Sequence, residues 1–169
     1  GLAGGATLTL VPERPFDLDA VCASIRRRHL GGRYATIVVV AEGATPAPGT
    51  WELPDPEVDR FGHARLGGVG VALGAEIEAR TGYETRVTVL AHLQRGGAPT
   101  AADRVLATGF GAAAARCVCE GEYGVMVAVR EGGIVPVPMR DAIAPLRRVP
   151  LDHHVLMAAR SVGIGFGDE

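Results

Sequence analysis

Three cationic side chains flank a short apolar run in the middle of the chain. Arg86 precedes residues 87–90, and His92 and Arg95 follow them. Beta-branched and leucine residues predict a short buried strand here, and the glycines and proline of residues 96–99 predict a turn after it. Guanidinium groups only donate hydrogen bonds, as does a protonated imidazole, so the stretch suits an oxygen-rich anion such as a phosphorylated sugar.

A carboxylate is expected near the same cations. Residues 36–41 form a second strand that is nearly all apolar, which is typical of a parallel sheet covered on both faces. Glu42 follows this strand and His92 follows the other, so both should emerge at one edge, where ligands of open α/β sheets bind. A carboxylate there can accept hydrogen bonds from sugar hydroxyls. From the residues alone two alternatives stay open: a solvated charge for Arg86 and a hydrogen-bonded structural histidine for His92.

The elements that must position these groups alternate between strand and helix. A beta-rich run at residues 7–11 is followed by Asp17, a residue suited to cap a helix over residues 18–30. Val21, Ile25 and Leu30 would form the inner face of that helix. With the strand at residues 36–41, this order predicts a parallel βαβ unit.

The next region combines an irregular excursion with a glycine-rich helix. Four prolines mark residues 45–59 as a surface insertion, which Trp51 would pin down. A helix is expected over residues 64–80, and its buried face would carry Val69, Leu73 and Ile77. The strand at residues 86–90 would follow it.

The second half of the chain predicts a long helix and a hairpin. Thr100 and Asp103 form a capping box that opens a helix ending near Cys119. Residues 125–129 and 134–137 flank a glycine-containing turn and predict a β-hairpin. The long helix should bury one apolar stripe, formed by Val105, Leu106, Phe110, Ala113 and Cys117.

The remaining segments are short. Residues 141–148 and 151–160 predict two short helices around Pro150. Residues 1–5 are typical of the frayed end of a helix, and the glycine-rich tail from Gly163 is also expected to be frayed.

The composition is that of an ordinary globular protein. The chain has 169 residues, of which 47% are hydrophobic and 21% charged, and its formal net charge is -2. This charge gives no reason to expect a nucleic-acid or membrane-surface partner. No apolar run of 18 residues and no signal-peptide pattern is found, so we expect a cytoplasmic protein. All 17 positive side chains are arginine, which excludes lysine Schiff-base chemistry and a phosphate-loop lysine.

The thiols and the paired histidines predict no metal site. Cys22, Cys117 and Cys119 lack a disulfide framework and fit reduced thiols in the cytoplasm. Two cysteines separated by one helical residue face different directions, and so do adjacent histidines such as His153 and His154.

The spaced motifs together resemble the 6-phosphofructokinase family, in its bacterial, actinobacterial-like form. The resemblance covers only the C-terminal half of the family's chain, and it implies an incomplete three-layer α/β sandwich with a mostly parallel sheet, plus a C-terminal β-hairpin and helices. The motifs are Val11-Pro12-Glu13, Pro15-Phe16-Asp17, Ala41-Glu42-Gly43, Thr81-Gly82, Glu84-Thr85-Arg86, His92, Gln94-Arg95-Gly96-Gly97, Pro99, Asp103-Arg104 and Leu106-Ala107-Thr108.

The resemblance implies roles for the four candidate residues. Glu42 would bind the hexose hydroxyls of fructose 6-phosphate, His92 and Arg86 its 6-phosphate, and Arg95 would lie near the reacting end. In this family the equivalent of Arg86 reaches into a neighbouring subunit's site, which implies a homo-oligomer, either a dimer or a tetramer.

The resemblance also implies an effector site and shows three departures. Glu13 and Arg33 match positions near effector ligands in the family, with simple surface charge as the alternative for Arg33. Gly31 replaces a second basic residue, Ala91 replaces the usual glycine before His92, and Gly109 replaces an arginine.

The resemblance divides the chain by role. Residues 1–95, with 151–169 returning to them, would form the sugar-phosphate-binding domain, and residues 96–150 would complete a donor domain. Because the sheet of that donor domain would come from the family's N-terminal half, we expect exposed apolar surface at Val105, Leu106 and Phe110.

Catalysis needs parts that this sequence does not contain. Phosphoryl transfer requires a base, a cradle for the donor phosphates and, as a rule, Mg²⁺. In the family these come from the N-terminal half, and no Gly-Gly-Asp-Gly or Thr-Ile-Asp-x-Asp stretch occurs here. We therefore expect the acceptor-binding portion of an enzyme, inactive alone and without a catalytic residue of its own. The donor, ATP or pyrophosphate, stays open, and the alternative is a non-catalytic sugar-phosphate-binding or subunit-interaction module.

Overall fold

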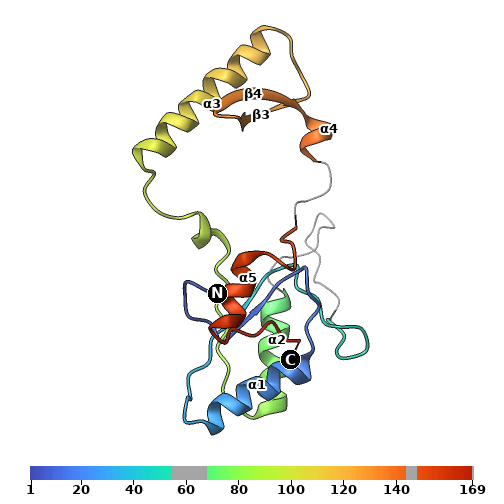
Figure 1. Cartoon of the computed structure of the whole chain (residues 1–169). Coiled ribbons are helices and arrows are strands. Elements are labelled where there is room, and N and C mark those ends of the chain that lie inside the picture. The colour runs from blue at the N-terminus through green and yellow to red at the C-terminus, as the bar shows by residue number, and fades with distance from the viewer. Residues whose placement is uncertain (55–67, 144–147, 169) are drawn as a thin grey trace. The chain divides into compact units, whose positions relative to one another are not determined.

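The computed structural model of the protein describes residues 1–54, 68–143 and 148–168 (Figure 1). The chain forms two compact units. The larger unit comprises Gly1–Ala91 and Arg148–Glu169, and the smaller comprises His92–Arg147. The boundary between them falls inside the cationic stretch, between Ala91 and His92.

The larger unit is built on a parallel βαβ arrangement, as the sequence predicts. Strands β1, Leu8–Leu10, and β2, Val38–Val40, pair in parallel, and helix α1, Leu18–Leu30, lies between them in the chain. The Asp17 side chain caps α1 by accepting from the backbone N–H of Asp19 at 2.7 Å. Both ends of this helix agree with the predicted range.

The core of the larger unit lies between the β1–β2 sheet and its helices. Val21 and Ile25 of α1 are buried, whereas Leu30 is 84% exposed, so its predicted place on the inner face is wrong. Leu30 is the last residue of the helix and extends beyond the core. The most completely buried side chains are Phe16, Leu8, Leu10, Leu18, Val21 and Cys22.

Helix α2, Gly68–Thr81, also packs on this core. Val69, Leu73 and Ile77 are buried, which confirms its predicted inner face. Trp51 packs against the core with its ring centroid 6.4 Å from that of Phe16. The expected start of the helix at residues 64–67, and residues 55–59 of the proline-rich excursion, lie outside the described residues.

The predicted third strand is wrong. Residues 86–90 form no strand, and Val87 and Leu90 are 43% and 51% exposed. In the described part of the larger unit the named strands are β1 and β2 alone, and neither pairs with this segment. A run of beta-branched residues favours a pleated, half-buried surface, but it becomes a strand only where a neighbour completes the hydrogen-bond ladder.

The glycine-rich tail is packed rather than frayed, which corrects another prediction. Gly165 forms a parallel bridge to Leu8, accepting from Thr9 N at 2.9 Å. Phe166 is 3% exposed. Gly167 has φ +75°, and a Cβ there would lie 2.8 Å from that of Phe16. The glycines therefore allow close approach to the core. At the other terminus, residues 1–5 form turns and not the end of a helix.

The smaller unit packs one long helix on a hairpin. Helix α3, Ala101–Cys119, begins with the predicted capping box of Thr100 and Asp103. Strands β3, Val125–Arg130, and β4, Gly133–Pro138, pair antiparallel, which confirms the predicted hairpin. Its two central turn residues, 131 and 132, have φ of 50° and 81°, as a type I′ turn requires.

The apolar stripe of α3 is only partly covered. Ala113 and Cys117 are buried, but Val105 is 74% and Leu106 42% exposed, and Phe110 is half-buried. A fully buried stripe is therefore wrong, and the expected exposed apolar surface is present. Gly109 has a packing role, because a Cβ there would lie 2.7 Å from Ile134 Cδ1 of the hairpin.

The short helices differ from their predicted ranges. Helix α4 spans Met139–Ala142 and starts two residues before the predicted 141, while residues 144–147 lie outside the described part. Helix α5 spans His154–Ser161 and starts three residues after the predicted 151. The reason is local: the imidazole of His153 caps α5, its Nδ1 accepting from Val155 N at 3.3 Å. Among the described residues, no helix has the length and apolar character needed to cross a membrane.

Candidate functional site

Arg86 lies on the exposed segment that follows α2. The backbone beside it is held by Glu78, whose Oε2 accepts from Thr85 N at 2.8 Å. The guanidinium group pairs with Glu84, whose Oε1 accepts from Nε at 3.0 Å and from Nη2 at 2.9 Å. The Arg86 and Glu84 side chains are 87% and 73% exposed. The cation is therefore oriented by a neighbour and remains accessible to a ligand.

Glu42 follows β2, as the order of the strands predicts. Ala41 N donates to Leu10 O at 3.0 Å, which extends the pairing of the two strands by one residue. A turn follows, closed by a bond from Ala44 N to Ala41 O at 3.0 Å. Glu42 thus occupies an exposed turn at the carboxyl end of a parallel sheet, where polar ligand-binding groups are commonly found.

His92 and Arg95 belong to one short 3-10 helix, η1, Ala91–Arg95. Both side chains are exposed. Ala91 has φ +42°, a conformation that glycine adopts most readily, so the replacement of glycine at this position leaves a strained residue at the entry of the helix. His92 and Arg95 therefore lie on a tight turn and not at the end of a strand.

The four candidate residues are divided between the two units. Glu42 and Arg86 belong to the larger unit, and His92 and Arg95 to the smaller. All four are exposed, and none is part of a hydrophobic core. This exposure is consistent with a binding role, but a solvated surface charge has it too.

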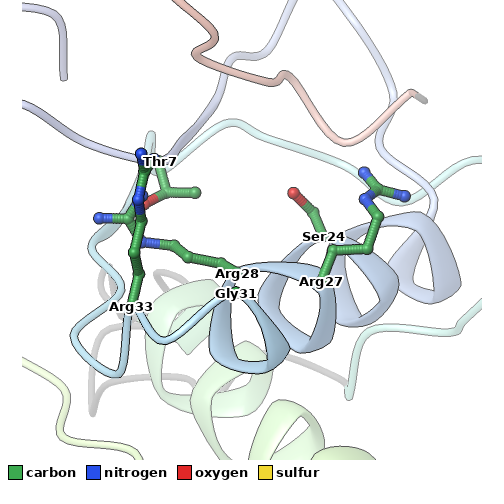
Figure 2. Close-up of a pocket in the computed structure, with 6 residues that line it drawn as sticks. All are labelled: Thr7, Ser24, Arg27, Arg28, Gly31 and Arg33. Carbon is green, nitrogen blue, oxygen red and sulfur yellow. The ribbon is translucent and has the colours of Figure 1, made fainter.

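A basic cavity of about 400 Å³ lies between the carboxyl end of α1 and the loop that leads to β2. Figure 2 shows Arg28 and Arg33 on one side of it and Arg27 on the other, with the Ser24 hydroxyl between them. Arg28 Nε donates to Ala35 O at 3.1 Å, which holds that side chain in place. The lining residues carry no carboxylate; they are Thr7, Ser24, Arg27, Arg28, Gly31 and Arg33.

The sequence did not predict this cavity. The family resemblance places Arg33 near effector ligands, but the arginines of residues 26–28 were not predicted to lie beside it. The signal that was available is the Gly31-Gly32 turn, which brings Arg33 back toward the end of α1. Of the two candidate effector residues, Arg33 lines the cavity. Glu13 does not, and its Oε1 accepts from Val149 N at 3.1 Å.

The three thiols and the paired histidines are further potential metal ligands of the chain. Cys22, Cys117 and Cys119 are free, and burial raises the pKa of the Cys22 thiol. The imidazole of His154 lies 4.3 Å from that of the helix-capping His153. Throughout residues 1–54, 68–143 and 148–168, no three His, Cys, Asp or Glu residues are grouped so as to hold a metal ion.

Comparison with known proteins identifies relatives of one family. A family model described as phosphofructokinase matches residues 1–118. The ATP-dependent 6-phosphofructokinase of Mycobacterium leprae is 53% identical over 150 residues, which are 89% of this chain and 44% of that protein. The pyrophosphate–fructose 6-phosphate 1-phosphotransferase of Amycolatopsis mediterranei is 51% identical over 154 residues, which are 91% of this chain and 45% of that protein. The chain thus spans less than half the length of these curated relatives.

Solved structures support the fold. A pyrophosphate-dependent phosphofructokinase from Marinobacter aquaeolei matches with a TM-score of 0.53 at 20% identity, covering 84% of this chain and 34% of that one. A second, from Nitrosospira multiformis, matches with a TM-score of 0.55 at 18% identity, covering 85% of this chain and 34% of that one. At this identity the likeness concerns the fold alone, and it confirms the expected α/β class.

Proposed function

The chain belongs to the phosphofructokinase family, as its motifs predict, and on that premise we propose that it is the acceptor-binding portion of a 6-phosphofructokinase. Its ligand would be fructose 6-phosphate. The observation that carries the proposal is the exposed cationic set Arg86, His92 and Arg95 within a chain that matches the relatives over nine-tenths of its length. Exposed cations with remaining donors are suited to a phosphate.

Each candidate residue has a proposed role in binding the acceptor. Arg86 and His92 hold the 6-phosphate through charge-assisted hydrogen bonds. Glu42 accepts hydrogen bonds from the sugar hydroxyls, and Arg95 lies near the 1-hydroxyl that attacks the donor phosphate. Such positioning contributes to the rate because phosphoryl transfer needs attacking and leaving oxygens in line.

The two parts of the chain have separate proposed roles. Residues 1–95, with 151–169, form a sugar-phosphate-binding domain, and residues 96–150 contribute to a donor domain. We propose that the complete enzyme uses Mg²⁺ with ATP or pyrophosphate, and that it works as a homo-oligomer in the cytoplasm. The names of the relatives include both donors, so they favour neither.

Titration calorimetry with fructose 6-phosphate tests the binding role. Replacing His92 or Arg95 with alanine should weaken binding by about 1–3 kcal/mol, because each change removes a charge-assisted contact. Arg140→Ala is the matched control: Arg140 is equally exposed and pairs with Asp141 at 3.6 Å in the smaller unit. Equal affinities for the chain and both site variants would refute the assignment.

An activity assay separates the proposal from its alternative. We expect no fructose 1,6-bisphosphate from this chain alone with Mg²⁺ and either donor. Magnesium-dependent product formation would overturn the expected inactivity. A chain that binds fructose 6-phosphate in the calorimeter and restores no activity with any complementing polypeptide would favour the alternative, a non-catalytic sugar-phosphate-binding or subunit-interaction module.

The basic cavity favours a second candidate function, an effector site for a phosphate-bearing ligand. The family resemblance implies this role for Arg33, and its position beside Arg27 and Arg28 supports it. Glu13, the other candidate, stays a prediction. With ADP as the probe, Arg33→Ala should weaken binding at least about fivefold if a charge-assisted bond is lost. Arg130→Ala, in the hairpin, serves as the control, and an unchanged affinity for Arg33→Ala would leave Arg33 as surface charge.

A further inference from the structure

The pairing of Glu84 with Arg86 assigns a role to a residue outside the proposed binding set. We infer that Glu84 is a positioning residue that orients the Arg86 guanidinium for the phosphate of the sugar. This role rests on the proposed function. The inference starts from two hydrogen bonds, which reach the same carboxylate oxygen from Nε at 3.0 Å and from Nη2 at 2.9 Å.

The geometry leaves the ligand-binding end of the guanidinium available. The group has five N–H donors in a planar fork. Glu84 engages one on Nε and one on Nη2, both along the side edge. Three donors remain, two on Nη1 and one on Nη2. One Nη1–H and the remaining Nη2–H form the end edge, which can bind a phosphate through two parallel bonds.

The backbone around Arg86 is already fixed on both sides. Thr85 N donates to Glu78 Oε2 at 2.8 Å. On the other side, Val87 lies against α2 at Gly74, where a Cβ would be 2.4 Å from Val87 Cγ2. The side chain itself is 87% exposed, so its rotamers are restricted mainly by Glu84. Holding those rotamers before the ligand binds reduces the entropy lost on binding.

If Glu84 instead competed with the ligand for Arg86, its removal would change the affinity for fructose 6-phosphate in the opposite direction. A carboxylate beside the cation reduces its attraction for an anion, so a residue that only competed with the ligand would weaken binding. Removing Glu84 would then strengthen the affinity for fructose 6-phosphate, whereas removing a positioning residue weakens it.

Four variants of the full chain, titrated with fructose 6-phosphate at constant ionic strength, decide between these roles. Glu84→Ala should weaken binding about threefold to fivefold, in line with coupling energies of exposed pairs. Glu84→Gln should stay within about twofold of the unaltered chain, because the amide oxygen can accept the same two bonds. In an Arg86→Ala background, Glu84→Ala should have no further effect.

Each contrary outcome is distinct. Unchanged or tighter binding by Glu84→Ala would overturn the positioning role, and so would an equal loss for Glu84→Ala with and without Arg86. If Arg86→Ala alone binds as tightly as the unaltered chain, the proposed phosphate contact of Arg86 fails, and the role of Glu84 fails with it. Binding that is lost in Arg86→Ala but unaffected in Glu84→Ala would leave the proposed function intact and remove only this inference.

Discussion

The two units of the molecule contrast in how completely they bury their apolar residues. In the larger unit, Phe16, Leu8 and Leu10 are at most 2% exposed. In the smaller unit, α3 and the hairpin are equally regular, yet Val105 on α3 is 74% exposed. Caps and turns are sufficient to specify a helix or a hairpin, but a core also requires partners from distant parts of the chain. The smaller unit therefore depends more on its local interactions, and the larger one on its packing.

The largest expected effect tests the packing of the larger unit. Phe16→Ala should destabilise it by about 3–5 kcal/mol, because it leaves a cavity at a fully buried position. Trp51 is the sole tryptophan and packs on this core, so urea unfolding followed by its fluorescence reports this unit. Val105→Ala in the smaller unit is the contrasting change. Followed by amide hydrogen exchange in α3, it should alter the stability of that unit by less than about 0.5 kcal/mol. Similar losses for both variants would break the comparison.

A second change tests the close contact between α2 and the segment that carries Arg86. Gly74→Ala should destabilise the larger unit by about 1–3 kcal/mol, because the added methyl would overlap Val87. The same tryptophan-monitored unfolding measures it. Gly68→Ala is the control, since nothing lies within 4 Å of a Cβ there. If Gly74→Ala were as stable as that control, Val87 would not pack as described.

A third change tests the local interactions of the smaller unit. Thr100→Ala should destabilise α3 by about 1 kcal/mol, since Thr100 Oγ1 accepts from Asp103 N at 3.2 Å at the N-terminus of the helix. Amide hydrogen exchange in the first turn of α3 should become faster, and exchange in α1 should not change. Thr108→Ala, within the same helix, provides the comparison. Unchanged exchange in α3 would show that the capping box contributes little.

The smallest expected effect is a pH dependence of the same cap. Hydrogen bonds from the N–H of Thr100, and then from its hydroxyl, lower the pKa of Asp103 below its ordinary value of 3.8. A carboxyl group with a lowered folded pKa stabilises the helix above pH 3.8, and this contribution is lost as the pH falls through the folded value. After division by the intrinsic rate at each pH, exchange in the first turn of α3 should therefore show an excess below pH 4. Asp103→Asn should abolish that excess; a variant that retained it would assign the effect elsewhere.

The parts of the fold that follow from local signals were predictable. The range of α1 follows from Asp17 before it and the glycines after it, and the α3 cap and the hairpin turn were equally visible. The failures involve distant partners. Residues 86–90 have strand-forming side chains, but no strand pairs with them among the described residues. The tail at Gly165 acquires order by pairing with Leu8. Neither outcome can be read from neighbouring residues.

The features of the candidate site divide in the same way, into residues that the local sequence identifies and contacts that depend on the fold. Residue type and spacing identified Arg86, His92 and Arg95, because cations around a turn are visible in the sequence. The hydrogen bonds that Arg86 donates to Glu84 depend on side-chain orientation, and the meeting of Arg33 with the arginines of α1 depends on the path of a loop. The sequence shows where charged residues occur along the chain. It does not show which of them line the same ligand-sized cavity.

The central claim, that a cationic stretch in the middle of the chain recognises a phosphorylated sugar, is tested most directly by nuclear magnetic resonance. In a ¹H–¹⁵N spectrum of the chain titrated with fructose 6-phosphate, we expect saturable shifts for Arg86, His92, Arg95 and Glu42, while the hairpin turn at residues 131 and 132 does not shift. Fructose without phosphate should produce much weaker changes. If these four residues do not respond, or respond no more than the hairpin, the stretch does not recognise the phosphorylated sugar.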